Sequence, residues 1–160
     1  MRFIGSALVA SAIVLGACGG GEKAPATDAA APAAAPAAAA TGTAAPITGT
    51  THEVKMIGDE KGYRFEPKDI TVKAGDGIKF TFVSGGPHNV AFNPADIPAD
   101  VKAQLDANMG PDKLAELSSK MTMAAGESVT ISFANIKAGT YPFNCTPHLA
   151  MGMKGTVTVQ

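Results

Sequence analysis

Soft metal-binding side chains gather near the C-terminus of this 160-residue chain. The run Cys145-Thr-Pro-His148-Leu-Ala-Met151-Gly-Met153 carries a thiol, an imidazole and two thioethers. A second imidazole, His88, lies far upstream. Cysteine, two histidines and methionine are the donors of a blue-copper electron-transfer site, in which Met is a weak axial ligand to a His₂Cys plane. The residue types therefore predict a copper site that exchanges single electrons.

The spacing of these donors fits one shared site. Cys145 at the end of a strand and His148 three residues later can turn inward from one loop, and His88 arrives from a second loop. A thiolate with two imidazoles suits both Cu(I) and Cu(II), so such a site moves little when an electron is transferred. Met151 and Met153 both follow His148, and spacing alone leaves either as the axial ligand.

The first 17 residues have the pattern of an export signal. A positive start is followed by the apolar run 3–15, which is too short to span a bilayer as a helix. The segment Leu15-Gly-Ala-Cys18 resembles the lipobox of bacterial lipoproteins, which implies that residues 1–17 are removed and that Cys18 is acylated. An ordinary cleaved signal with an incidental cysteine is the alternative.

Cysteine usage supports a metal role for Cys145. The chain has two cysteines, so lipidation of Cys18 leaves Cys145 as the sole free thiol of an exported protein, with no partner for a disulfide. Metal ligation explains a thiol that is kept under oxidising conditions. The formal net charge is −1 and no basic patch stands out, which argues against a nucleic-acid partner.

A spacer separates Cys18 from the folded domain. Residues 18–46 are rich in Ala and interrupted by Pro, so neither a stable helix nor a packed core is expected. We predict a disordered linker that reaches roughly 30 Å as a coil. It would hold a single domain, residues 47–160, away from a membrane.

Apolar residues in the domain recur mainly with period two. Strands are predicted around Val54–Met56, Ile70–Val72, Ile78–Phe82, Val129–Phe133 and Val157–Val159, separated by Gly-rich turns. The pattern indicates an antiparallel sandwich or barrel. The exception is 98–119, where spacings of three and four predict two short helices broken at Gly110-Pro111. Their apolar face is expected to pack on the core, and Met56, Met121 and Met123 are expected to be core residues.

Two motifs carry a family resemblance. His88-Asn89-Val-Ala-Phe and the run 145–153 look like the copper loops of plastocyanins and pseudoazurins, and the similarity extends over 51–160. It implies an all-β cupredoxin Greek-key sandwich with one type 1 copper per chain. His88, Cys145 and His148 would be the equatorial ligands, and Asn89 would tie the copper loops together.

The same resemblance selects the axial ligand. In these families the ligand stands in the pattern Met-x-Gly-x-Val, which here is Met153-Lys-Gly-Thr-Val157. Met153 is therefore the predicted ligand, and Met151 is expected on the loop surface.

The resemblance also implies an electron port at His148. The residues expected around it are small or apolar, namely Gly86, Pro87, Pro147, Ala150 and Met151. Plant plastocyanins carry Tyr before the copper Cys, within an acidic patch, whereas Asn144 stands here among mixed charges. We hypothesise that His148 is the single port, through which a monomer docks transiently with redox proteins such as cytochromes c or respiratory and photosynthetic complexes.

The predicted function is a membrane-tethered electron carrier rather than an enzyme. A copper oxidase or nitrite reductase is the rival hypothesis, but such an enzyme needs more copper centres and histidines flanking the Cys, where Asn144 and Thr146 stand. Copper trafficking and zinc binding are the remaining alternatives. The protein is expected on the periplasmic or cell-surface side. Gly19, rather than an acidic residue, follows Cys18 and favours an outer-membrane anchor in a two-membrane cell.

Overall fold

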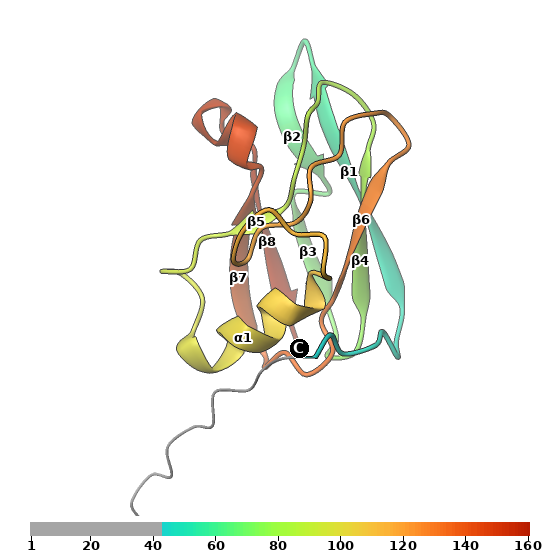
Figure 1. Cartoon of the computed structure of the whole chain (residues 1–160). Coiled ribbons are helices and arrows are strands. Elements are labelled where there is room, and N and C mark those ends of the chain that lie inside the picture. The colour runs from blue at the N-terminus through green and yellow to red at the C-terminus, as the bar shows by residue number, and fades with distance from the viewer. Residues whose placement is uncertain (1–42) are drawn as a thin grey trace, which may run out of the picture. The chain divides into compact units, whose positions relative to one another are not determined.

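The computed structural model describes residues 43–160. The predicted leader, Cys18 and nearly all of the predicted linker lie outside the described residues. Two four-stranded sheets face each other (Figure 1). The predicted β-sandwich is confirmed.

Within residues 43–160, the structure contains the five strands that the period-two pattern predicts and three further strands. The first sheet contains β1 (Thr51–Asp59), β2 (Gly62–Glu66), β4 (Gly77–Phe82) and β6 (Ser128–Ser132). The second contains β3 (Asp69–Val72), β5 (Ala91–Phe92), β7 (Gly139–Asn144) and β8 (Lys154–Val159). The strand orders are β2-β1-β4-β6 in the first sheet and β3-β8-β7-β5 in the second. The described residues also contain one α-helix, α1 (Ala99–Asn108), and one 3₁₀ helix, η1 (Thr146–Met151).

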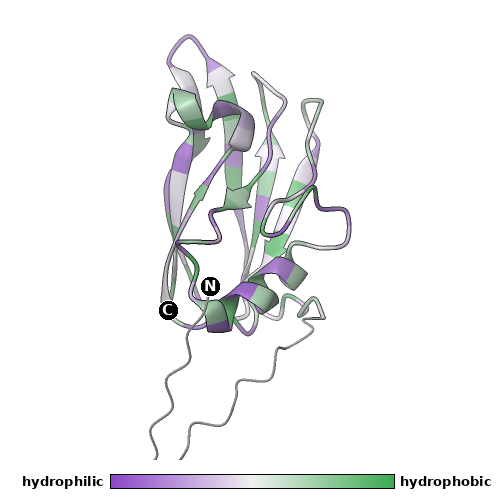
Figure 2. Cartoon of the chain, turned by 60° about the vertical axis from the view of Figure 1, so that its left-hand side comes forward, coloured by the Kyte–Doolittle hydropathy of each residue, from purple (hydrophilic) through white to green (hydrophobic). Residues whose placement is uncertain are grey.

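Alternation of side chains fills the space between the sheets. Ile78, Phe80 and Phe82 of β4 are buried, whereas the two residues between them are only half-buried, and hydropathy alternates along the strands in the same way (Figure 2). Phe65, Phe80 and Phe143 meet edge to face, with ring centroids 4.7–6.0 Å apart. Such pairs contribute about 0.5–1.5 kcal/mol each beyond simple burial, and this cluster joins the two sheets.

The predicted all-antiparallel pairing is wrong for two strand pairs. β1 pairs with β4 in parallel, and β3 pairs with β8 in parallel. The chain leaves the first sheet after β2, adds β3 to the second sheet, and then returns to the first sheet as β4 beside β1. Parallel neighbours result because each such connection crosses between sheets instead of turning back as a hairpin. The period-two pattern of apolar residues does not distinguish parallel from antiparallel pairing.

The helical insertion is half helix and half extended chain. Val101, Leu105 and Met109 are buried, so the first helix packs on the core as predicted. The second predicted helix is wrong: the structure has no helix over 111–119, and Leu117 has a φ of 55°, which is incompatible with a right-handed helix. Residues 118–122 instead run beside the segment that follows β4, with hydrogen bonds between His88 and Thr122 of 2.8 and 3.0 Å.

The helix also fastens the segment that leads into the domain. The Asn108 side chain accepts a hydrogen bond from the Ala45 amide at 2.8 Å, and it donates to the carbonyl groups of Ser132 and Ala134. Gln104 donates to the carbonyl oxygen of Thr43 at 3.1 Å. The helical half of the insertion therefore covers the end of the sandwich where β1 begins (Figure 1), which favours a structural role over partner selection.

A buried carboxylate closes the same end. Asp76 accepts hydrogen bonds from the amides of Lys73 and Thr50 and from Nε2 of His52, at 2.8–2.9 Å. These bonds, led by that from the Lys73 amide, lower the pKa of Asp76 to about 2. His52 therefore has a structural partner far from the predicted metal ligands. Among residues 43–160, no helix is both long and apolar enough to cross a membrane.

Candidate metal centre

Three predicted ligands converge at the opposite end of the sandwich. His88 lies in the loop after β4, Cys145 follows β7 directly, and His148 lies in η1. Their donor atoms all lie within 4.8 Å of one another. The Sγ atom of Cys145 is 3.6 Å from Nδ1 of His88 and 3.4 Å from Nδ1 of His148.

These distances fit a single metal ion. Bonds of about 2.3 Å to sulfur and about 2.0–2.1 Å to nitrogen place the two atoms roughly 3.6–3.8 Å apart at tetrahedral to trigonal angles. Cys145 and His88 are fully buried and His148 is 5% exposed, so the donors are shielded from water. The residues therefore fit a copper ion without a large rearrangement.

Hydrogen bonding fixes the tautomer of His88. Its Nε2 atom lies 2.8 Å from the carbonyl oxygen of Ser84, which can only accept a hydrogen bond. The ring proton must therefore sit on Nε2, which leaves the Nδ1 lone pair directed toward Cys145. The Phe82 ring meets this imidazole edge-on at 5.0 Å, and Gly86 leaves room for Phe82, because a Cβ atom at position 86 would collide with that ring.

The loop from Cys145 to Met153 is closed by its own backbone. The amide of His148 donates to the carbonyl of Cys145, the amide of Met153 donates to His148, and the amide of Cys145 donates to Met153, at 3.1–3.2 Å. Gly152 makes the return possible with a φ of 83°, a value that favours glycine. Two predicted ligands are thus held in one tight turn between β7 and β8.

Asn89 links this turn to the His88 loop. Its Oδ1 atom accepts a hydrogen bond from the Thr146 amide at 2.7 Å, and its Nδ2 atom donates to Oγ1 of Thr146 and Oγ of Ser118 at 3.1 Å. Asn89 is fully buried, so these bonds are protected from competing water. The side chain thereby ties three segments together around the donors.

Burial keeps the metal-free donors uncharged. Burial raises the pKa of the Cys145 thiol, although backbone amides of Asn89 and His148 oppose the rise. Burial also lowers the pKa of His88. The pKa of His148 is lowered by burial and by the neighbouring His88. At pH 7 the site therefore holds a thiol and two neutral imidazoles.

The two candidate axial methionines differ sharply in environment. Met153 is fully buried and immediately precedes β8, whereas 55% of Met151 is exposed. A buried thioether beside the Cys145 backbone can face the donors from within the sandwich. Met151 instead lies on the surface of the loop.

The surface above the donors is largely apolar. His148 is buried, but the residues expected around it are all exposed, namely Gly86, Pro87, Pro147, Ala150 and Met151. Leu149 and Val83 are each 42% exposed, and Met123, predicted to be a core residue, is 67% exposed. Met123 reaches solvent because the preceding Thr122, which pairs with His88, is buried, and successive side chains of an extended segment point to opposite sides. Only a small part of His148 reaches the surface.

Tyr63 of β2 is the residue that sequence reasoning missed. Its ring is stacked on the His148 imidazole, with centroids 3.7 Å apart and planes inclined by 17°. The available signal was the tyrosine in the Gly62-Tyr-Arg-Phe run, but nothing in that spacing links β2 to the loop 145–153.

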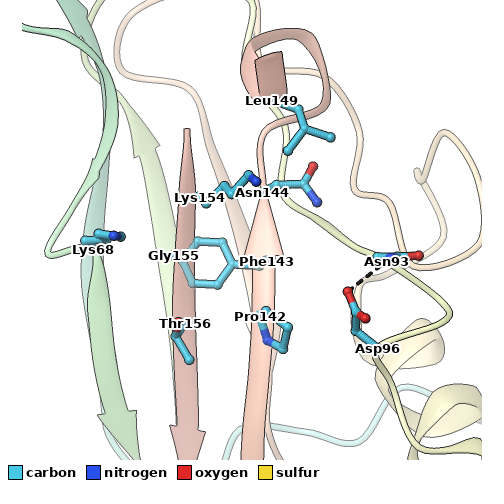
Figure 3. Close-up of a pocket in the computed structure, with 10 residues that line it drawn as sticks. All are labelled: Lys68, Asn93, Asp96, Pro142, Phe143, Asn144, Leu149, Lys154, Gly155 and Thr156. Atoms are coloured by element: carbon cyan, nitrogen blue, oxygen red, sulfur yellow. Dashed lines mark hydrogen bonds between the residues drawn. The ribbon is translucent and has the colours of Figure 1, made fainter. Parts of the chain in front are cut away.

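The surface beside Asn144 carries no acidic patch among the described residues. A depression of about 480 Å³ lies there, lined by Lys68, Lys154, Asp96 and neighbours from β7 and β8 (Figure 3). Asp96 accepts a hydrogen bond from Asn93 on the side away from Lys68. The acids of α1 are also paired, since Asp100 contacts Lys137 and Asp106 contacts Lys113.

Comparison with known proteins agrees with this geometry. Residues 52–160 match the family described as "Copper binding proteins, plastocyanin/azurin family". The chain belongs to this family. Plastocyanin of Nostoc punctiforme is 40% identical over 111 residues, which cover 69% of this chain and 74% of that protein. Plastocyanin A/B of Petroselinum crispum is 38% identical over 107 residues, covering 67% of this chain and 98% of that protein.

A solved structure extends the comparison to the fold. Oxidised plastocyanin from Dryopteris crassirhizoma aligns with a TM-score of 0.53 and 35% identity, covering 68% of this chain and 99% of that one. The predicted cupredoxin fold is confirmed. Together, the family and the donor set give this cupredoxin one type 1 copper site and the role of an electron carrier rather than an enzyme.

Metal binding should release protons in a defined amount. Because the pKa of Cys145 is raised and those of both histidines are lowered, binding of one Zn²⁺ to the metal-free protein at pH 7 is expected to release about one proton. Zinc is the probe because it accepts the same donors without redox chemistry. Calorimetric titration in buffers of different ionisation enthalpy measures the release, with Cys145→Ser as control. Binding without proton release would mean that the thiolate already exists in the metal-free protein.

Proposed function

We propose that this protein is a membrane-tethered carrier that moves single electrons between redox proteins. The observation that carries the proposal is the buried trio of Cys145 Sγ and two imidazole Nδ1 atoms at 3.4 and 3.6 Å. Copper, when bound, supplies the Cu(I)/Cu(II) couple. The chain supplies a fixed donor set, excludes water and holds both imidazoles in place.

The proposed ligands are His88, Cys145 and His148, with Met153 as the axial donor. Full burial of Met153 and exposure of Met151 support this choice. A thioether approaching from the interior would tune the reduction potential of the copper. Asn89 acts through the ligands, because its hydrogen bonds hold Thr146 and so the turn that carries Cys145 and His148.

Electrons are proposed to enter and leave at the apolar surface over His148. Apolar rims of this kind suit small, short-lived contacts that need little desolvation. The mixed charges beside Asn144 give no reason to place a second port there. Suitable partners are proteins that expose a haem or copper centre, such as cytochromes c or membrane redox complexes, with this protein acting as a monomer.

The tether is proposed to be an acylated Cys18. The support is the lipobox-like segment Leu15-Gly-Ala-Cys18, followed at once by an Ala/Pro-rich stretch. Two or more acyl chains would suffice for stable anchoring, since each buried CH₂ contributes about 0.8 kcal/mol. The domain would then work on the exported side, with an outer-membrane anchor favoured where two membranes exist.

Colour tests the electron-carrier function directly. The Cu(II) protein is expected to show an intense visible thiolate-to-copper band, because Cys145 binds the ion. Ascorbate should abolish this band by reduction, and Cys145→Ser should lack it. His52→Ala is the matched control and should keep it, since His52 bonds to Asp76 at the other end. A colourless Cu(II) complex would favour copper trafficking instead.

Paired methionine variants test the axial ligand. Met153→Leu should raise the reduction potential by about 60 mV or more, a tenfold change in a one-electron equilibrium, because loss of a weak donor destabilises Cu(II) more than Cu(I). Met151→Leu should leave potential and colour nearly unchanged. Cyclic voltammetry and visible spectra measure both, and the reverse ranking would make Met151 the ligand.

Cysteine variants test the tether in cells that express the full chain. Native protein should fractionate with membranes and incorporate a palmitate analogue, whereas Cys18→Ser should lose both properties because it removes the acylated sulfur. Cys145→Ser serves as the control, since it changes the other cysteine and should remain in the membrane fraction. Unchanged membrane association of Cys18→Ser would refute lipid anchoring at this residue.

A further inference from the structure

Tyr63 contacts both histidines of the copper site. Its ring lies 3.7 Å from the His148 ring in a nearly parallel stack, and it meets the His88 ring at 6.2 Å with an angle of 66°. The contact with His88 is a preferred edge-to-face arrangement, whereas the contact with His148 is a close, nearly parallel stack. Tyr63 belongs to β2, which is remote in sequence from both copper loops.

The first sheet is shaped to admit this ring. Tyr63 pairs directly with Gly58 of β1, and the missing side chain at position 58 leaves room beside it. A Cβ atom at position 58 would lie 2.6 Å from Cε1 of Tyr63 and 2.8 Å from Cα of Gly85. Gly85 itself has a φ of 72°, so two glycines accommodate the close approach.

The two histidines are oriented by different means. His88 is fixed through Nε2, which donates to the carbonyl of Ser84. For His148, the hydrogen bonds within residues 43–160 involve only Nδ1, which faces Cys145, and the backbone. Two ring contacts therefore restrain the plane of the His148 imidazole: the stack with Tyr63 on one face and the edge contact with His88 at 4.9 Å.

We propose that Tyr63 is a positioning residue for His148 and forms the outer contact for electron exchange. This inference rests on the proposed electron-carrier function. His148 is only 5% exposed, whereas Tyr63 is half-buried and adjoins it. A partner that docks over His148 meets the phenol ring as well, and a restrained imidazole keeps the transfer geometry constant between encounters.

Two substitutions distinguish the role of the Tyr63 ring from that of its hydroxyl group. Tyr63→Leu removes the stack, and Tyr63→Phe is the matched control that keeps it. In the metal-free protein, proton NMR should show the His148 ring signals losing their ring-current shift in Tyr63→Leu and keeping it in Tyr63→Phe. Thermal denaturation of each variant confirms that it is folded.

Electron exchange provides the functional readout. In mixtures of the Cu(I) and Cu(II) forms, NMR line broadening gives the self-exchange rate. It should fall roughly tenfold in Tyr63→Leu, since small misplacements of reacting groups cost up to about 100-fold, and stay near the native value in Tyr63→Phe. The reduction potential and the Cu(II) electron paramagnetic resonance spectrum should shift only in Tyr63→Leu.

The outcomes separate this inference from the proposed function. A native self-exchange rate and spectrum in Tyr63→Leu would overturn the role of Tyr63 while leaving the carrier function intact. Failure of the native protein to form a coloured copper site would instead overturn the carrier function. In that case, the ring signals of the metal-free protein still decide whether Tyr63 positions His148.

Discussion

The copper end of this protein depends on the hydrogen bonds between Asn89 and Thr146. The ligands come from two loops that lie far apart in the sequence. A buried amide that accepts from the Thr146 backbone at 2.7 Å and donates to its hydroxyl makes the two loops one unit. Because the amide is shielded from water, the link keeps its strength, and a site held in this way changes little between oxidation states.

The two halves of the insertion act at opposite ends of the sandwich. The extended half of the insertion runs beside His88 and supplies Ser118 as a further partner of Asn89. Its helical half instead packs at the far end of the sandwich and holds the incoming chain. The insertion therefore supports the metal loops at one end and the N-terminal segment at the other.

Local patterns predicted much of this arrangement, because strand periodicity and ligand spacing are local properties. β4 and the Cys145–Met153 turn are examples, since each is defined by neighbouring residues. What could not be predicted depends on contacts between distant segments. The parallel pairing of β1 with β4, the extended course of 118–122 and the stack of Tyr63 on His148 all follow from how the sheets pack. Single-sequence reasoning has no access to that packing.

Residues 43–50 are fastened at the end of the sandwich where β1 begins, which is opposite the donor residues. β1 has nine residues and extends roughly 30 Å at about 3.3 Å per residue. The redox centre therefore lies about one strand length from the place where the chain enters the domain. A partner protein can thus reach the copper end of the sandwich without touching the segment through which the chain enters it.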